Sequence, residues 1–385
     1  MSPRFAFVWP TPPDAPTAAA ARLSGFLDAA TRMKIPTCVL VPLPDGRQSG
    51  SPRPPLYDSL VASKGSAYAL ARLPDTVFRL ARFLQSENCN LVVASSPAPM
   101  LAFQSLLAAK LADVPFVFDI RDSWEMEAFT HEGRFRNSLK AFCERACVVG
   151  AARVLCVTKT LIEQVSLSSG APLDRFVFVP NGADLSLFGP RQASPIADLV
   201  FAGSPARYRD IPRVLEAVSE LRNRLPTVRL VCLGWAESPQ EAAIRTRIRD
   251  IGLESNVVLR PSVRHRDVAQ ILPGCRLGIV SLSGDRAFRS AVGAKAYEYL
   301  ASGVPLACLG PEGASELRDF VEANGVGFFA TTPKEFAERA AELLSTEQVR
   351  LRLSERCEKL AIQFDRRTIS DSCLERILVP LATIG

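Results

Sequence analysis

The chain alternates short, almost uninterrupted apolar runs with longer segments in which apolar residues recur at helical spacing. Six of these runs, rich in β-branched and aromatic residues, occur before residue 190, and six occur after it. Runs of this kind are typical of parallel strands that helices cover on both faces. We expect strands at residues 4–10, 36–44, 90–96, 115–120, 153–158, 175–180, 197–203, 228–234, 256–261, 276–282, 304–310 and 325–330.

Helices are predicted between the strands. In the first half they are expected at about residues 18–34, 76–85, 99–112 and 136–149, and after Thr158. A strand–helix alternation that occurs twice predicts an α/β fold of two doubly wound, Rossmann-like domains facing each other. We expect a first domain over residues 1–190, a second over 191–363, and a C-terminal helix over 364–385 that packs back at the domain junction.

Candidate binding residues follow one strand of the second domain directly. In "LVFAGSPARYRDI", Gly203 and Ser204 end the strand, and Arg207 and Arg209 precede a helix that begins near Ile211. Ligands of open α/β sheets bind beyond the carboxyl ends of the strands. Glycine lets a ligand approach the backbone, and two arginines near a helix N-terminus suit a diphosphate. Surface arginines without a ligand are the alternative interpretation.

A second group lies in "GAKAYEYLASGVPL", where a helix leads into a buried strand. Lys295 and Glu298 are three residues apart and therefore share a helix face. A lysine and a carboxylate placed there could hold phosphate and ribose hydroxyls, respectively. The alternative is an ordinary surface ion pair, which contributes ~0–1 kcal/mol.

Two further segments belong to the first half of the chain. In "PFVFDIRDSW", Asp119, Arg121 and Asp122 lie at the end of a strand, where they either face the interdomain cleft or form a closed ion-pair network. In "VPNGADLSLF", Asn181 and Gly182 predict a tight turn, and Asp184 can cap the residues that follow it. A simple domain hinge is the alternative for the second segment.

These motifs, in this order, resemble glycosyltransferase family 4 of the GT-B fold, and most closely the branch that builds bacterial surface polysaccharides. The most specific parts are "VPNGAD" and "KAYEYLASGVP". The resemblance implies that Glu298 binds the donor's ribose and that Arg209 neutralises its pyrophosphate. The donor-binding residues would be Gly203, Ser204, Arg207, Arg209, Lys295, Tyr297 and Glu298. The catalytic residues would be Asp119, Asp122, Arg209 and Lys295.

The family's activity implies an expected reaction. A retaining glycosyltransferase of the hexosyltransferase type would move a sugar from a UDP- or GDP-linked donor to a saccharide acceptor. The acceptor would be a lipid-linked oligosaccharide at the inner membrane face, used in cell-surface polysaccharide biosynthesis. No metal and no tightly bound cofactor are expected.

The sequence departs from the family at one important position. Many members carry a glutamate eight residues before the equivalent of Glu298, and it helps to hold the transferred sugar; here that residue is Ser290. Two alternatives therefore stay open. They are a nucleotide-sugar epimerase of the same architecture and a non-catalytic partner subunit.

Composition narrows the remaining classes of protein. The net charge of +6 is carried mostly by arginine, which reflects either a GC-rich genome or an anionic substrate. No basic run with interleaved aromatic residues appears, so nucleic acid is not an expected partner. The ten cysteines form no C-x-x-C pair, and only two histidines exist to complete a metal site. No segment resembles a signal peptide or a membrane span, so we expect a cytoplasmic protein with at most peripheral membrane contact.

Overall fold

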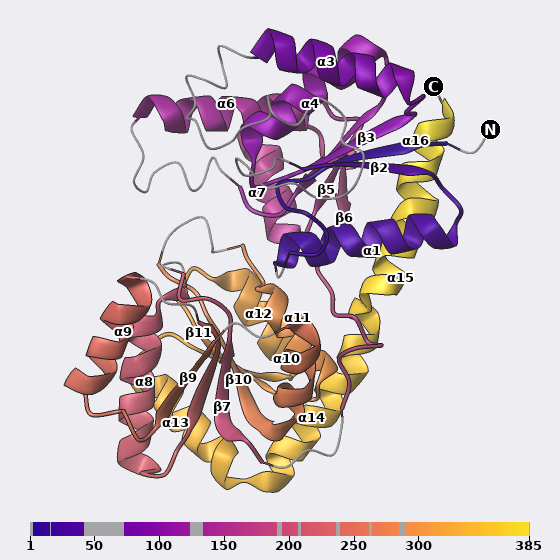
Figure 1. The fold of residues 1–385 in the computed structure, drawn as a ribbon. Coiled ribbons are helices and arrows are strands. Elements are labelled where there is room, and N and C mark those ends of the chain that lie inside the picture. Colours follow the sequence, from indigo (N-terminus) through magenta and orange to yellow (C-terminus); the bar gives the residue numbers. More distant parts are fainter. Residues whose placement is uncertain are drawn as a thin grey trace. The chain divides into compact units, whose positions relative to one another are not determined.

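The computed structural model describes residues 3–15, 17–41, 73–123, 134–190, 195–206, 209–235, 239–261, 264–284 and 290–384 (Figure 1). The chain divides into two compact units. Unit 1 contains residues Met1–Pro180 and Arg367–Gly385, and unit 2 contains Asn181–Arg366.

Unit 1 is built on a six-stranded parallel sheet with the order β2-β1-β3-β4-β5-β6. The order of the strands reverses at β1, because β2 lies on one side of β1 and all later strands lie on the other. The strands are β1 (Phe5–Val8), β2 (Thr37–Leu40), β3 (Leu91–Ser95), β4 (Phe116–Ile120), β5 (Arg153–Cys156) and β6 (Phe176–Phe178).

Helices cover both faces of this sheet, and each face has its own apolar core. One core joins the sheet to α3, α4, α6 and α7, and the other joins it to α1 and the C-terminal segment. The helices are α1 (Ala18–Arg32), α3 (Leu73–Ser86), α4 (Pro99–Ala112), α6 (Arg134–Gly150), α7 (Lys159–Ser169), α15 (Arg366–Cys373), the π-helical turn η8 (Leu374–Leu378) and α16 (Val379–Ile384), with the 3-10 turn η3 (Leu173–Arg175) before β6.

Unit 2 repeats the design with a second six-stranded parallel sheet, ordered β12-β11-β10-β7-β8-β9. Its first strand, β7, is central, and the strand order reverses between β7 and β10. This is the order of dinucleotide-binding sheets, which bind ligands at that reversal. The strands are β7 (Ala197–Ala202), β8 (Leu230–Trp235), β9 (Val257–Pro261), β10 (Cys275–Ser281), β11 (Leu306–Leu309) and β12 (Gly327–Ala330).

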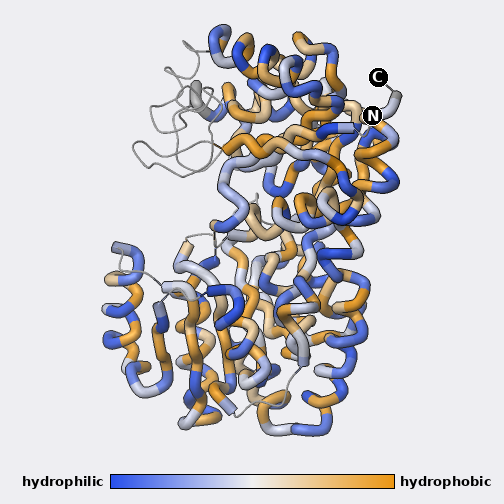
Figure 2. The backbone as a smooth tube through the Cα atoms, turned by 45° about the vertical axis from the view of Figure 1, so that its right-hand side comes forward, coloured by the Kyte–Doolittle hydropathy of each residue, from blue (hydrophilic) through white to orange (hydrophobic). Residues whose placement is uncertain are grey.

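Two apolar cores again flank the sheet of unit 2. One lies under α8, α9 and α13, and the other lies under α10, α11, α12 and α14. Figure 2 shows the central strands of both units as mainly hydrophobic segments, as expected for strands that are buried on two faces. The helices are α8 (Ile211–Arg224), α9 (Pro239–Asp250), α10 (His265–Ile271), α11 (Ala294–Ala301), α12 (Ser315–Asn324), α13 (Pro333–Ser345) and α14 (Glu347–Ala361), with the 3-10 turns η5 (Leu272–Gly274) and η7 (Ile362–Phe364).

The expected α/β architecture of two doubly wound sheets is confirmed, and each predicted strand overlaps an observed one. The division between the units follows Pro180 rather than residue 190. Ala183 and Phe188 explain the difference, because both side chains are buried in the core of unit 2. The C-terminal segment belongs to unit 1, where Leu374 and Leu378 are buried against the α1 face of the sheet.

No helix among the described residues is long and apolar enough to cross a membrane.

Candidate functional site

The most distinctive charged group of unit 2 is centred on Glu298, in the middle of α11. Its carboxylate is 4% exposed, and both of its oxygens contact a cationic or polar side chain. Nζ of Lys295 lies 2.9 Å from Oε2, and Nε2 of His265 lies 2.8 Å from Oε1. Lys295 and Glu298 therefore form an ion pair, which was the alternative interpretation of their spacing, and the pair has a third member from α10.

This environment keeps Glu298 ionised. Burial by itself raises the pKa of the carboxyl group, but the Lys295 ammonium and the hydrogen bond from His265 outweigh it and lower the pKa to about 2. Because an ionised carboxylate can only accept hydrogen bonds, Nε2 of His265 is the donor in their contact. Lys295 and His265 are more exposed than Glu298, at 28% and 34% of their side chains.

Arg209 lies at the carboxyl end of β7, immediately before α8. Its guanidinium covers Gly203 so closely that a β-carbon added there would lie 1.5 Å from Nη1. Nη1 also donates to the carbonyl oxygen of Ser204, at 3.1 Å. Glycine is favoured at position 203 by its φ of +147°, which L side chains rarely adopt, whereas the flexible side chain of Arg209 could move aside.

Arg209 also lies at the reversal of strand order in unit 2. The hydroxyl of Ser281, the last residue of β10, donates to the carbonyl oxygen of Arg209. β7 and β10 are the two neighbouring strands between which the order reverses. Gly203, Ser204 and Arg209 therefore occupy the place where sheets of this type bind nucleotides.

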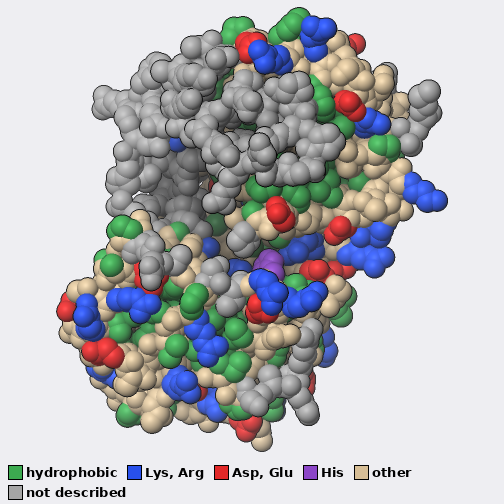
Figure 3. Space-filling view, in the orientation of Figure 1, with side chains coloured by type: hydrophobic (Ala, Val, Ile, Leu, Met, Phe, Trp, Pro, Cys, Tyr) green, Lys and Arg blue, Asp and Glu red, His purple; other side chains and the backbone are tan. Residues whose placement is uncertain are grey.

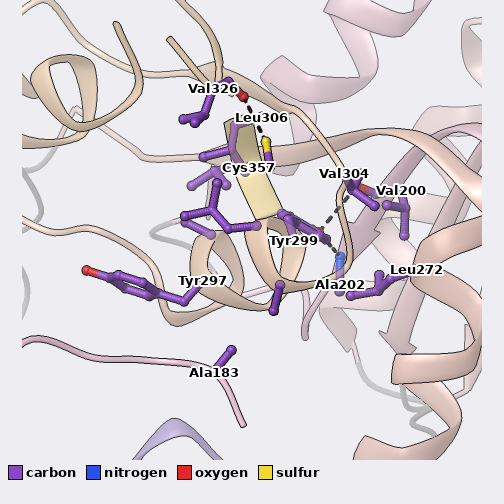
Figure 4. Packing of buried hydrophobic residues seen from close by; sticks show 14 of the residues in the cluster. Ala183, Val200, Ala202, Leu272, Tyr297, Tyr299, Val304, Leu306, Val326 and Cys357 are labelled. Carbon is purple, nitrogen blue, oxygen red and sulfur yellow. Dashed lines mark hydrogen bonds between the residues drawn. The ribbon is translucent and has the colours of Figure 1, made fainter. Parts of the chain in front are cut away.

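Tyr299, the neighbour of Glu298 in α11, reaches the carboxyl end of β7. Its fully buried hydroxyl accepts a hydrogen bond from the amide of Ala202 at 2.8 Å and donates to the carbonyl of Val200 (Figure 4). Burial raises the pKa of this hydroxyl, the negative charge of Glu298 adds to that, and the positive charge of Arg209 opposes it. Both charged groups are therefore within electrostatic reach of one buried hydroxyl.

Tyr297, which the sequence placed among the donor-binding residues, faces a different set of partners. It points to the opposite side of α11 from Tyr299 (Figure 4). Its buried ring packs against Phe320 and Phe364, with ring centroids 5.5 and 5.0 Å apart. These contacts give Tyr297 a packing role in the core of unit 2.

The segment over residues 181–188 forms a turn after Asp184, over residues 185–187, whereas Asn181 and Gly182, where the sequence predicted a tight turn, form none. Oδ1 of Asp184 accepts hydrogen bonds from the amide and the hydroxyl of Ser186, at 3.0 and 2.6 Å. The turn places Phe188 in the core of unit 2, where its ring meets the ring of His265 edge to face at 5.6 Å. This motif therefore reaches the Glu298 group through an aromatic contact.

In unit 1, Asp119 lies at the carboxyl end of β4 and is completely buried. Arg22, from α1, grips it with two nitrogen atoms, and Nη2 lies 2.7 Å from Oδ1. The hydroxyl of Ser95 donates to the other oxygen, Oδ2, at 2.8 Å. One sequence interpretation paired Asp119 with Arg121, whereas Asp119 forms its ion pair with Arg22, and the side chain of Arg121 donates to the hydroxyl of Ser95 and to the carbonyl of Ser96.

Asp122 differs from Asp119 in its surroundings. Its backbone amide lies 3.4 Å from the hydroxyl of Ser96, and its residue is only partly buried. Burial of the carboxyl group raises the pKa of Asp122, and the nearby charge of Arg121 opposes that shift. Asp122 is therefore the more accessible of the two candidate acids in unit 1.

Two of these contacts could not be found from sequence spacing. Arg22 and Asp119 are 97 residues apart, and His265 and Glu298 are 33 residues apart. Arg207, which was expected to contact the diphosphate, lies outside the described residues. Ser290 is described and is almost completely buried, at 5% exposure.

We looked for possible metal ligands in the part of the chain that the structure describes. That part contains no group of three or more histidine, cysteine or acidic side chains that could hold a metal ion.

On the visible face of unit 2, Lys and Arg side chains are interspersed with Asp and Glu (Figure 3). The arginine-rich composition therefore does not produce one continuous basic surface on that face.

Family models match both halves of the chain. Residues 18–182 match the glycosyl transferase 4-like domain, and residues 197–346 match the glycosyl transferases group 1. A D-inositol 3-phosphate glycosyltransferase from Paenarthrobacter aurescens is 27% identical over 184 residues. That match covers 45% of this chain and only 44% of the relative's own length.

Solved structures share the whole fold. Sucrose-phosphate synthase from Thermosynechococcus elongatus superposes with a TM-score of 0.79 at 13% identity, and each chain is covered completely. Anabaena HepE, crystallised with UDP and glucose, superposes with a TM-score of 0.72 at 16% identity, covering 97% of this chain and 99% of its own. The expected GT-B architecture is thereby confirmed.

Proposed function

We propose that this chain, a GT-B-type protein that joins two glycosyltransferase-family domains, transfers a sugar from a nucleotide sugar to a saccharide acceptor. One arrangement supports this function most directly. In unit 2, the buried and ionised carboxylate of Glu298 pairs with Lys295, and the guanidinium of Arg209 lies against Gly203 beyond the carboxyl end of β7, at the order reversal of the sheet. A ribose needs a carboxylate that accepts hydrogen bonds, and a diphosphate needs cations close to it.

The donor would be held by residues of unit 2. Oε2 of Glu298 accepts hydrogen bonds from the ribose, while Arg209 and Lys295 neutralise the diphosphate. Gly203 and Ser204 bring the backbone close to the phosphates, because no side chain at Gly203 stands in the way. The N-terminus of α8 adds a partial positive charge on the same side of the sheet. Arg207 completes this donor-binding set.

The reaction we propose proceeds with retention of the anomeric configuration. The bond between the anomeric carbon and the donor's phosphate oxygen breaks, and a new bond to the acceptor hydroxyl forms on the same face. The negative charge that gathers on the leaving diphosphate is stabilised by Arg209 and Lys295. That diphosphate takes the acceptor's proton, so the step needs no histidine base.

The acceptor would be bound by unit 1. Asp122, partly buried and with its pKa raised by burial, is the acid that contacts the acceptor. Asp119 has no exposed surface and is fully engaged by Arg22 and Ser95, so we give it a positioning role for the loop that carries Asp122.

A lipid-linked acceptor fits one surface of unit 1. The neighbouring helices α3, α4 and α6 carry exposed apolar side chains, Phe78, Leu111 and Phe142, which are each more than half exposed. Exposed basic residues lie beside them, and the guanidinium of Arg82 lies 5.8 Å from the centre of the Phe78 ring. Apolar and basic side chains together favour the surface of an anionic membrane. We therefore propose peripheral membrane contact and a role in polysaccharide assembly.

The test is a thermal-shift and hydrolysis screen over UDP-, GDP- and ADP-linked hexoses. We expect stabilisation by one nucleotide class and slow hydrolysis of its sugar in the absence of acceptor. If no nucleotide sugar shifts the melting temperature, the donor site in unit 2 is wrong. Interconversion of the sugar nucleotide without net hydrolysis or transfer would instead identify an epimerase.

The membrane contact has its own test. Co-sedimentation with phosphatidylglycerol vesicles should exceed that with phosphatidylcholine vesicles, and the paired substitutions Phe78→Ser and Phe142→Ser should reduce it. Equal binding to both vesicles, or full binding by the paired variant, would exclude this surface.

A further inference from the structure

His265 takes part in the Glu298 group, although the transfer chemistry described above does not use it. It is the first residue of α10, and its Nε2 donates to Oε1 of Glu298 over 2.8 Å. The contact joins two separate elements, α10 and α11, at the one carboxylate that we assign to the ribose. It therefore fixes where that carboxylate lies relative to the rest of unit 2.

The ring of His265 is itself held in place. The edge-to-face contact with Phe188 has centroids 5.6 Å apart and an interplanar angle of 86°. Phe188 is only 1% exposed and belongs to the core of unit 2. Aromatic pairs in this geometry are favourable, and here one partner cannot move without disturbing the core.

Lys295 is constrained less tightly. Its ammonium is at the end of four rotatable bonds and lies partly exposed, at 28%. Glu298 is almost inaccessible while both of its oxygens are occupied, at 4% exposure. A ligand hydroxyl can therefore reach the carboxylate only if one of its two partners turns away, and the flexible lysine is the one that is free to do so.

We propose that His265 is a positioning residue for nucleotide binding. It keeps hold of Oε1 of Glu298 when Lys295 leaves Oε2 for the diphosphate, so that the carboxylate stays oriented toward the ribose hydroxyls. The inference rests on the proposed donor site. It assigns to His265, through Glu298, the preference of this site for ribonucleoside over deoxyribonucleoside diphosphates.

The preference for ribose over deoxyribose distinguishes a positioning role of His265 from a role in stabilising the fold alone. We would measure dissociation constants for UDP, 2′-deoxy-UDP and 3′-deoxy-UDP, and for the matching GDP series, by isothermal titration. A hydrogen bond to a charged group predicts that the wild-type protein prefers the ribonucleotide about 10- to 100-fold. His265→Ala should lower that preference by about tenfold, chiefly by weakening the ribonucleotide.

Two further variants make the test specific. His265→Gln places an amide donor near the position of Nε2 and should restore most of the ribose preference. Arg264→Ala changes the neighbouring residue, which is 85% exposed and pairs with Asp267, and should leave the preference unchanged. Once the donor is known, His265→Ala should raise the donor KM more than it lowers kcat.

The outcomes are distinguishable. Full ribose preference in His265→Ala overturns the positioning role and leaves the donor site intact. The positioning role is also overturned if His265→Ala loses the ribose preference and a folded His265→Gln variant does not recover it. A structural contact alone would then explain the loss. If the wild-type protein binds none of the nucleotides, or binds ribo and deoxy forms equally, the assignment of Glu298 to the ribose fails, and the role of His265 fails with it.

Discussion

Two buried carboxylates, one in each unit, differ in what surrounds them: Asp119 lies near the carboxyl end of β4, and Glu298 lies in the middle of α11. Asp119 of unit 1 is fully buried, and its partner Arg22 is buried as well, at 6% exposure. Glu298 of unit 2 is equally withdrawn, but its partners Lys295 and His265 reach the surface. The first arrangement is closed, whereas the second can exchange a protein partner for a ligand.

The difference shows how burial separates structural ion pairs from binding sites. A carboxylate whose cation is also buried has no route to a ligand, and removing either partner leaves an unpaired charge in the core. A carboxylate whose cations are exposed keeps its charge and orientation while its partners can move. We therefore expect substitutions at Asp119 to affect folding and substitutions at Glu298 to affect binding.

The largest expected effect is on the stability of unit 1. Asp119→Asn should lower the free energy of unfolding by about 3–5 kcal/mol, because Arg22 would remain buried without its counter-charge. Urea denaturation followed by circular dichroism measures this loss. Asp371→Asn is the matched control, since that carboxylate pairs with Arg32 at 30% exposure and should cost about 0–1 kcal/mol. An equal loss of unfolding free energy in the two variants would contradict the structural role of Asp119.

The next effect is on turnover. Arg209→Ala should lower kcat on the order of a hundredfold, or about 3 kcal/mol, because one donor to the leaving diphosphate is lost. Steady-state kinetics with the donor from the nucleotide-sugar screen measures it. Arg224→Ala, at the far end of α8 and paired with Glu338, should retain wild-type turnover. A fully active Arg209→Ala variant would contradict the assignment.

A smaller effect is expected on nucleotide affinity. Glu298→Gln should weaken binding of the nucleoside diphosphate about 10- to 100-fold, because a neutral amide accepts hydrogen bonds less strongly than a carboxylate. Titration calorimetry measures the change, and Glu322→Gln, a half-exposed carboxylate paired with Arg339, serves as the control. If Glu298→Gln instead unfolds the protein as Asp119→Asn does, the two carboxylates have the same role and the comparison fails.

The last effect is a dependence of stability on pH. The pKa of Glu298 is lowered from 4.5 to about 2 in the folded protein, so its ionised form stabilises the fold. That stabilisation is fully present above the unfolded pKa of 4.5 and is lost as the pH falls toward 2. The difference in unfolding free energy between wild type and Glu298→Gln should thus be constant above about pH 5 and shrink below it. A difference that stays constant down to about pH 3 would contradict this.

Much of the fold could be predicted from local patterns. The helix over residues 99–112 matches α4, and the apolar run over residues 197–203 contains β7, because both depend on apolar spacing within a short segment. The ion pair of Lys295 with Glu298 was also accessible, since three residues separate them on one helix. Thus secondary structure and neighbours within one helix could be obtained from the sequence alone.

The partners of the buried carboxylates could not be predicted in this way. Arg22 meets Asp119, and His265 meets Glu298, only after separate strands and helices have packed together. Tyr297 shows that a residue next to Glu298 in the sequence can face different partners in the structure. Its position beside Glu298 suggested donor binding, but adjacent helix residues point to different sides, and its ring packs against Phe320 and Phe364.

A crystal structure of the protein with the nucleoside diphosphate found in the screen tests the donor site most directly. We predict a ribose hydroxyl within hydrogen-bonding distance of Glu298, the diphosphate beside Arg209, and His265 still bonded to Oε1. A nucleotide bound away from β7 and α11, with Glu298 still held by both Lys295 and His265, would contradict the proposed site.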